Sequence, residues 1–322
     1  MKKITQKEIA AKLGLHVRTV SRVLNHEDTV KPETRLKVVA ELNRNGYFFQ
    51  THCRPEVVAV DIQPGYLEGQ ALRLIEMLSH RGLQFRMTNH KADLRHFHEV
   101  LSGSELAVFC STPSVKIIEE TGQRYPDLYR INLFSHGVPG AEVSIEPDND
   151  TLAKRSARYL AECGHRDILI VTSAESAAVM ERTKSFIGEM TVSFPGVRCR
   201  MVMESLNMEL GDRIAAVLET ITPKPTAIYC PGLYIAWHTA QVLLRMKCSV
   251  PDEISILMND LPEEFAYEMP FQPDTVFSRS SDIIELAEFY ITNRIMLKNA
   301  RSVVVSPGTE LQINGTVAKL KR

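Results

Sequence analysis

Hydrophobic positions change their spacing along this chain, and the change divides it into two unlike parts. Over roughly the first fifty residues, apolar side chains recur every three or four positions, which is the period of helices with one buried face. From Glu56 onward, short apolar runs alternate with longer amphipathic stretches, which is typical of strands followed by helices. We therefore expect a small helical domain over residues 1–52 and a larger α/β domain over residues 53–322.

The first part predicts three short helices. Thr5 and Glu8 are spaced as a capping box, in which each side chain binds the other residue's backbone amide, so a helix should begin just after Thr5. Gly14 should end it, and a second helix should span about residues 17–24. After a polar loop, Pro32 suits the first turn of a third helix. Two helices joined by a tight glycine turn and followed by a third are the helix-turn-helix plan.

The second part predicts nine strands with helices between them. The expected strands are residues 57–62, 83–88, 105–111, 129–134, 142–146, 167–172, 198–203, 226–231 and 254–259. The expected helices include residues 68–80, 151–162, 180–190, 211–219 and 235–246. Strand–helix alternation of this length favours parallel sheets covered on both faces. Nine strands exceed one sheet, so we expect two α/β lobes with a ligand cleft at their strand ends.

Charge is distributed as unevenly as hydrophobicity. Residues 1–52 hold ten Lys and Arg against five Asp and Glu, a net charge of +5, whereas the remaining residues hold 28 against 34, a net charge of −6. A basic head on an acidic body suggests an anionic partner for the head, although a solvated basic face has the same composition. The chain contains neither an apolar run of about 18 residues nor a signal peptide at its N-terminus. We therefore expect a cytoplasmic protein.

The second predicted helix carries the candidate DNA contacts. In the helix-turn-helix plan this helix enters the major groove of DNA, and its first residues meet base edges. Arg18 and Arg22 can each give two hydrogen bonds to a guanine, whereas Val17 can contact a thymine methyl group. Short side chains that suit phosphate oxygens accompany them. They are Thr5, Thr19, Ser21, Asn25 and Thr34.

The motif ITQKEIAAKLGLHVRTVSRVLN at residues 4–25, followed by VKPETRLKVVAELNRNGY at residues 30–47, closely resembles the headpiece of the LacI (lactose repressor) family of transcriptional regulators. His16 departs from the family, which usually places a capping Ser there. Because His caps poorly, His16 should either contact a phosphate itself or leave the helix start looser. After Tyr47 the chain reads FFQTHCRPEVVAV, without the family's P-N and A-x-x-L, so we do not expect its standard hinge helix.

The second part is similar to the body of the same family, which looks like a two-lobed periplasmic sugar-binding protein. The matching segments are PDNDTLAKRSARYLAECGHRDILIV (147–171), ERTKSF (181–186), PTAIYC (225–230) and VPDEISIL (250–257). The resemblance implies one lobe of about residues 56–147 and 276–304, and a second of about residues 148–275 and 305–322. The first loop looks more like that of the xylose-sensing branch.

Carried over from the family, the effector-binding residues are Tyr66, Asp148, Arg182 and Asp260. An Arg and a carboxylate can fork onto adjacent hydroxyls, and an aromatic ring can cover a sugar face. Simpler roles stay open: Asp148 and Asp260 as turn or cap residues, and Arg182 in a salt bridge with Glu181 or Glu175. Leu206 and the Gly232–Leu233 pair replace family ligand residues.

The leading hypothesis is a DNA-binding transcriptional regulator, by family habit a repressor, that binds a near-palindromic operator as a homodimer. A small molecule, expected to be a sugar, would modulate its affinity from the cleft between the lobes. One alternative keeps DNA binding but makes the body a ligand-independent dimerisation domain, and another is a sugar-binding protein with an idle headpiece. We expect no enzyme, because GxSxG, Walker, HExxH and GxGxxG motifs are missing, and no metal or other cofactor.

Overall fold

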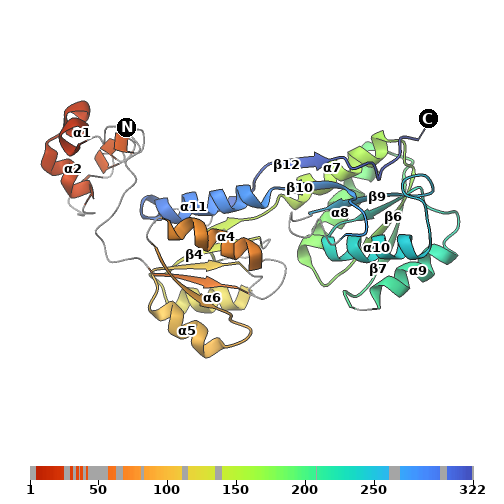
Figure 1. Cartoon of the computed structure of the whole chain (residues 1–322), viewed down its shortest axis with the longest axis horizontal. Helices are drawn as coiled ribbons and strands as arrows, with labels where there is room; N and C mark the ends of the chain where they lie inside the picture. Colours follow the sequence, from red (N-terminus) through yellow and green to blue (C-terminus); the bar gives the residue numbers. More distant parts are fainter. Residues whose placement is uncertain are drawn as a thin grey trace.

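The chain forms a small helical head and two α/β lobes, each lobe built on a six-stranded sheet (Figure 1). The computed structural model describes residues 5–24, 30–31, 34–35, 37–38, 41–42, 57–62, 68–80, 83–110, 115–134, 140–207, 209–260, 269–297 and 303–320. Asn25, Tyr66 and the hinge region after residue 42 lie outside these ranges. The predicted fold class, a helix-turn-helix head followed by parallel-sheet lobes, is confirmed.

The head contains the two predicted helices α1 (Gln6–Leu13) and α2 (Val17–Leu24). The capping box is present: Thr5 Oγ1 accepts from the Glu8 amide at 3.3 Å, and a Glu8 carboxylate oxygen accepts from the Thr5 amide at 2.6 Å. Gly14 ends α1 at φ 64°, a left-handed conformation that side chains disfavour. The buried core of the head also includes residues from the third predicted helical segment. This core consists of Ile9, Ala10, Val20, Val23, Val30, Val38 and Leu42.

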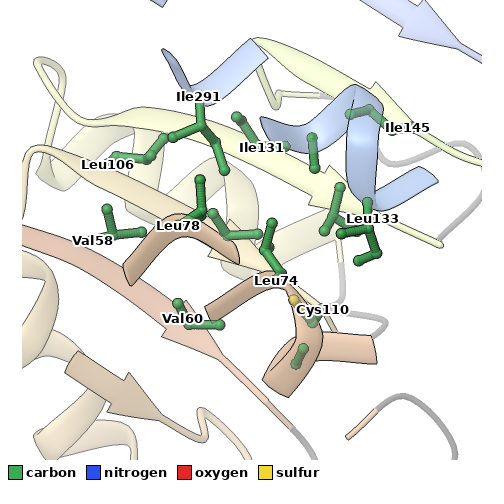
Figure 2. Packing of buried hydrophobic residues seen from close by; sticks show 14 of the residues in the cluster. Val58, Val60, Leu74, Leu78, Leu106, Cys110, Ile131, Leu133, Ile145 and Ile291 are labelled. Carbon is green, nitrogen blue, oxygen red and sulfur yellow. The ribbon is translucent and has the colours of Figure 1, made fainter. Parts of the chain in front are cut away.

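Lobe 1 is a parallel sheet in the order β11-β5-β4-β3-β1-β2. Its strands are β1 (Val57–Asp61), β2 (Gln84–Thr88), β3 (Leu106–Phe109), β4 (Tyr129–Leu133), β5 (Val143–Ile145) and β11 (Val303–Val305). Its helices are α4 (Glu68–Ser79), α5 (Leu94–Ser102), α6 (Val115–Arg124) and α11 (Ser280–Leu297). Leu74 and Leu78 of α4 pack with Ile291 of α11 over one face of the sheet (Figure 2). Phe97 of α5 packs against Ala59 on the opposite face.

Lobe 2 has the sheet order β12-β10-β9-β8-β6-β7, in which β12 alone runs antiparallel to its neighbour. Its strands are β6 (Asp167–Thr172), β7 (Arg198–Met203), β8 (Ala227–Cys230), β9 (Ser255–Asn259), β10 (Asp274–Ser278) and β12 (Thr309–Gln312). Its helices are α7 (Asn149–Glu162), α8 (Ala177–Ser193), α9 (Leu210–Thr220) and α10 (Leu233–Arg245). The first two helices pack on one face of the sheet and the last two on the other.

The chain passes between the lobes at three places in its described part. These are the segments between β5 and α7, between β10 and α11, and between β11 and β12. The nine predicted strands are all present, whereas β10, β11 and β12 were not predicted. Because β10 pairs with β9 in the second sheet, lobe 2 continues to Ser278, and the return to lobe 1 follows that residue rather than residue 276. Among the described helices, none is both long and apolar enough to span a bilayer.

Candidate functional site

The carboxyl ends of the lobe 2 strands form the first candidate site. The connection from β6 leads to β7 on one side, whereas β8 lies on the other side of β6. The chain therefore changes direction between β6 and β8. In open α/β sheets such a switch point forms the crevice in which ligands bind. The loops after β6, β8 and β9 meet at this edge, and α8 brings Arg182 to it.

Arg182 is the centre of a buried polar cluster. Its Nε donates to Asn149 Oδ1 at 2.7 Å, and its Nη1 donates to the carbonyl oxygen of Pro231 at 3.0 Å. Its Nη2 forms an ion pair with the Asp260 carboxylate. Only 6% of Arg182 is exposed, so the guanidinium is held in one orientation. Three of its five N–H groups are engaged by described residues, which leaves one N–H on each terminal nitrogen for a ligand.

Asp260 follows the last residue of β9 and has a φ of 52°, in the left-handed region. Asp and Asn tolerate this conformation better than other side chains with a Cβ atom. Its amide donates to the carbonyl oxygen of Val276 at 3.2 Å, which ties the turn to β10. Residues held in sparsely populated backbone conformations cluster at binding sites. The turn points the carboxylate toward Arg182.

A second polar layer supports the cluster from within lobe 2. Asn149 is 2% exposed, and its Nδ2 donates to a Glu181 carboxylate oxygen at 3.0 Å. Tyr229 of β8 stacks on Phe186 with 4.0 Å between ring centroids, and its hydroxyl donates to Asn259. Burial raises the pKa of Tyr229 far above its ordinary value, so the hydroxyl stays a neutral donor. Connected buried hydrogen bonds of this kind hold the strand ends in a single arrangement.

The structure brings two of the four predicted effector residues together. Arg182 and Asp260 are 78 positions apart in sequence and form a direct ion pair. Asp148 instead caps α7, because its two carboxylate oxygens accept from the amide and the hydroxyl of Thr151 at 2.9 and 2.7 Å. This is the cap role that the sequence left open for Asp148. Tyr66 lies outside the described residues.

Asn149 and the Pro231 carbonyl were not predicted as part of this site. Asn149 carries a sequence signal, since it is the second residue of the D-N pair that resembles the family motif. A carbonyl oxygen has no such signal, because every residue has one. Glu181, an alternative partner for Arg182, accepts a hydrogen bond from Asn149. Asn149 thus lies between the two side chains.

The head forms the second candidate site. On α2 the Arg18 side chain is exposed, and Val17, Thr19, Ser21 and Arg22 are half-buried. Val17 packs in part against the head core, so less of it is available for a base than of Arg18. Thr5 donates its hydroxyl proton to Glu8 at 2.8 Å within the capping box. Thr34 is half-buried in a helical segment.

His16 lies between the glycine turn and α2. Its Nδ1 accepts from the Arg18 amide at 3.2 Å, and its carbonyl oxygen accepts from the Thr19 amide at 2.8 Å. The ring therefore serves as the N-cap of α2. Of the two expectations for His16, a loose helix start does not agree with this geometry.

Comparison with known families divides the chain into the same two parts, the helical head and the α/β body. Residues 5–48 match the family of bacterial regulatory proteins, lacI family, and residues 157–278 match the periplasmic binding protein-like domain. The head is a lacI-family DNA-binding domain, and the chain has the two-part architecture of a LacI-family transcriptional regulator. Members of this family are regulators of transcription rather than enzymes. The predicted family is therefore confirmed.

Known relatives extend the likeness over most of the regulator. The HTH-type transcriptional regulator CelR of Thermobifida fusca is 26% identical over 287 residues, which cover 80% of this chain and 82% of CelR. A LacI family regulator from Enterococcus faecium with bound ribose matches 83% of this chain and all of its own at 15% identity, with a TM-score of 0.68. A lac repressor dimer bound to operator and the anti-inducer ONPF matches 98% of this chain and all of its own at 17% identity, with a TM-score of 0.64. At such identities the two structures establish the fold.

Proposed function

We propose that this regulator binds a near-palindromic operator as a homodimer and that a sugar in the cleft beside Arg182 changes its affinity for that operator. Repression is the expected outcome, since the bound operator would be closed to transcription. The observation that carries the proposal is the Arg182–Asp260–Asn149 cluster at the switch point of lobe 2, in a chain whose head is a lacI-family DNA-binding domain.

Operator reading is assigned to α2. Arg18 is exposed on its first turn, and Arg22 lies one turn further along the same helix. Each can pair with guanine O6 and N7, which discriminates by about 1–3 kcal/mol against a wrong base. The net charge of +5 attracts the phosphate backbone, but so few phosphate contacts bind weakly at physiological salt. Two heads on a symmetric site supply the remaining affinity.

Dimerisation is assigned to α4 and α11, which pack together over one face of lobe 1. Leu72 of α4 is 49% exposed and Phe289 of α11 is 55% exposed. Large apolar side chains exposed on two neighbouring helices suit a self-complementary interface. The lac repressor of similar fold was crystallised as a dimer on its operator, which supports a dimer here.

Sugar binding is assigned to the remaining donors of Arg182 and the Asp260 carboxylate. A guanidinium and a carboxylate side by side can donate to and accept from adjacent hydroxyls, which is the pattern a sugar offers. The regulator from Enterococcus faecium holds ribose in a similar fold. A bound sugar would alter operator affinity only as far as it favours one arrangement of the lobes over another.

A second candidate function is a DNA-binding regulator whose body dimerises but binds no ligand. It is favoured by the mutual neutralisation of Arg182 and Asp260 and by apolar Leu206 and Leu233, which stand where the family has ligand residues. Melting the protein against a panel of sugars separates the two candidates. A true effector present at 100 times its dissociation constant adds about 2.7 kcal/mol of stability. A panel without any shift would favour the ligand-free body.

The experiment that tests DNA binding is selection of duplexes from a random pool with the purified full-length protein. We expect a symmetric motif with guanines in each half, because each dimer presents two copies of α2. The spacing of the two halves also reports the distance between the heads. A folded protein that enriches no duplex over bulk DNA would contradict the proposed function.

A further inference from the structure

Two arginine side chains converge on the first residues of β12, where the chain enters lobe 2 from its third crossing. Arg279 donates from Nε and Nη2 to the two carboxylate oxygens of Glu310 at 2.7 and 2.8 Å. Arg155 of α7 donates from Nη1 to the carbonyl oxygen of Thr309 and to its hydroxyl, the latter at 3.3 Å. A guanidinium that bonds both oxygens of a carboxylate fixes the geometry of the pair as well as its charge. The start of β12 is therefore tied to two other segments of the chain.

Arg279 belongs to lobe 1 through its backbone. Ser278 ends β10 and Ser280 begins α11, so Arg279 is the single residue between them. Its carbonyl oxygen accepts from the amides of Asp282 and Ile283 at 3.2 and 3.4 Å, as the carbonyl oxygen of an N-cap residue does. Helix α11 then runs over lobe 1 and packs with α4 (Figure 1). Arg279 is therefore attached to the first turn of a lobe 1 helix.

Glu310 belongs to lobe 2. It is the second residue of β12 and lies opposite Phe277 in the antiparallel pairing of β12 with β10. The ion pair therefore joins the start of a lobe 1 helix to the edge strand of lobe 2. Arg155 extends the connection to α7, which begins directly after the first crossing. Side chains gathered at one place thus connect all three crossings between the lobes.

We propose that Arg279 and Glu310 form a latch between the lobes: the pair is closed in the lobe arrangement of Figure 1 and opens when lobe 1 turns about the three crossings. Hinge motions are absorbed by a few residues at the ends of elements, which is where Arg279 lies. Helix α11 also carries Phe289, part of the surface assigned to dimerisation, so such a turn reorients that surface relative to lobe 2. The inference rests on the proposed function, since it specifies how a ligand in the cleft and an operator on the heads influence each other.

The latch is strong enough to bias two lobe arrangements and weak enough to open. The Arg279 and Glu310 side chains are 53% and 44% exposed, so water and salt screen the pair. The hydrogen bonds from Arg279 lower the pKa of Glu310, and the charges of Arg279 and Arg155 lower it further, so the carboxylate is ionised at neutral pH. A half-exposed pair changes a two-state equilibrium by about two- to five-fold. A ligand shifts the same equilibrium only by its difference in affinity for the two arrangements.

The test measures the distance between the lobes in the full-length protein, with fluorophores attached through unnatural amino acids at His96 of α5 and Val192 of α8. Both positions are exposed, and one lies in each lobe. Labelled protein is diluted into excess unlabelled protein, so that a dimer carries one labelled copy. Single-molecule energy transfer then gives the populations of the two arrangements without DNA or ligand. We expect Glu310→Gln and Arg279→Gln each to lower the latched population relative to the other by about two- to five-fold.

The double variant, Arg279→Gln with Glu310→Gln, should shift the populations no further than either single variant, because the pair is lost only once. Arg245→Gln is the matched control: Arg245 of α10 pairs with Asp212 of α9 at 3.1 Å, so this exposed pair lies wholly within lobe 2. It should leave the populations unchanged. Populations that are the same in the wild type and both single variants would overturn the latch. Additive shifts in the double variant, or an equal shift in Arg245→Gln, would do so as well.

Affinity for the selected duplex and for a scrambled duplex, measured on the same proteins, separates the latch from the proposed function. We expect both latch variants to change affinity for the selected duplex by up to the same factor as the populations, and Arg245→Gln to bind as the wild type does. A wild-type protein that binds neither duplex contradicts the proposed function, whereas shifted populations would still establish the latch. Shifted populations with unchanged affinity in both latch variants would overturn its role in regulation, because the lobes would then move without affecting the operator.

Discussion

At the scale of single residues, the Arg182–Asp260 pair links the proposed effector site to the stability of lobe 2. Their side chains are 7% and 16% exposed, so each charge is largely withdrawn from water. Breaking a buried pair by removing one partner is costly because the other charge stays buried alone. Removing both charges costs much less. The pair can therefore be examined by a double-mutant cycle.

We predict that Asp260→Asn lowers the free energy of unfolding by about 3 kcal/mol, because it leaves the Arg182 guanidinium without a counter-charge. Arg182→Met combined with Asp260→Asn should recover part of that loss. Chemical denaturation of the purified proteins measures both values. Additive losses in the double variant would mean that the two side chains do not interact in solution.

Arg18 provides a residue-scale test of base reading. It is exposed on α2, so Arg18→Ala should leave the fold unchanged. We predict at least a ten-fold loss of affinity for the selected duplex, from about 1–3 kcal/mol of lost guanine contact. Discrimination against the scrambled duplex should fall with it. Arg95→Ala, at another exposed arginine on α5, is the control and should bind normally. An unchanged preference in Arg18→Ala would move base reading away from this residue.

Not all of the site was open to prediction at the residue scale. Arg182 and Asp260 came from the family resemblance, and their pairing follows only once the ends of α8 and β9 meet in space. The contact with Pro231 depends on where its backbone carbonyl oxygen points, and no residue type in the sequence signals that direction. Asp148, another motif position carried over from the family, caps the start of α7 with its carboxylate, and its role in effector binding stays a prediction.

At the scale of elements, the strands that are simplest to predict are those buried on both faces. Seven of the nine predicted strands are largely buried and read as apolar runs because helices cover both sides of each sheet, whereas β2 and β7 lie at sheet edges and are partly exposed. β12 has the sequence TELQ and lies at a sheet edge, so it has no apolar run to detect. β11 has three residues, too few to show a period. Both follow α11, where the chain crosses between lobes, and only the fold reveals their pairing.

Helix α7 and the turn after it bring a buried histidine into lobe 2. His165 is fully buried, and its Nδ1 lies 3.0 Å from the Thr226 hydroxyl. Burial lowers the pKa of His165, with a smaller contribution from the nearby Arg166 charge. His165 in the folded protein therefore binds a proton less readily than in the unfolded chain, where a histidine titrates near pH 6.5. Stability should be constant above that pH and decline below it.

We predict that the wild type loses stability between about pH 7.5 and about pH 5.5 and that His165→Gln loses less over the same interval. His96→Gln is the control, because His96 is exposed on α5 and should not alter the pH response. Chemical denaturation at both pH values gives the comparison. An identical decline in His165→Gln and wild type would assign the pH dependence to other groups, such as His238, whose pKa burial also lowers.

At the scale of the whole molecule, the boundary between basic and acidic parts coincides with the boundary between the DNA-binding head and the α/β body. A head of net charge +5 precedes a body of net charge −6, so the body repels DNA while the head is drawn to it. In the proposed homodimer the two heads are joined through their bodies, and the apolar side chains exposed on α4 and α11 are the surface assigned to that contact. On this proposal, DNA recognition and association between bodies are separable by mutation.

We predict that Leu72→Glu combined with Phe289→Glu yields a folded monomer, because two carboxylates would be buried without partners in the interface. Sedimentation equilibrium measures the mass, and affinity for the selected duplex should fall toward that for scrambled DNA as one of the two heads is lost. Leu94→Glu is the matched control: Leu94 is 50% exposed, comparable to Leu72, but lies on α5, on the other face of the lobe 1 sheet. It should remain dimeric and bind normally. A double variant that stays dimeric would place the interface elsewhere, whereas a monomer with undiminished affinity would show that one head suffices to read the operator.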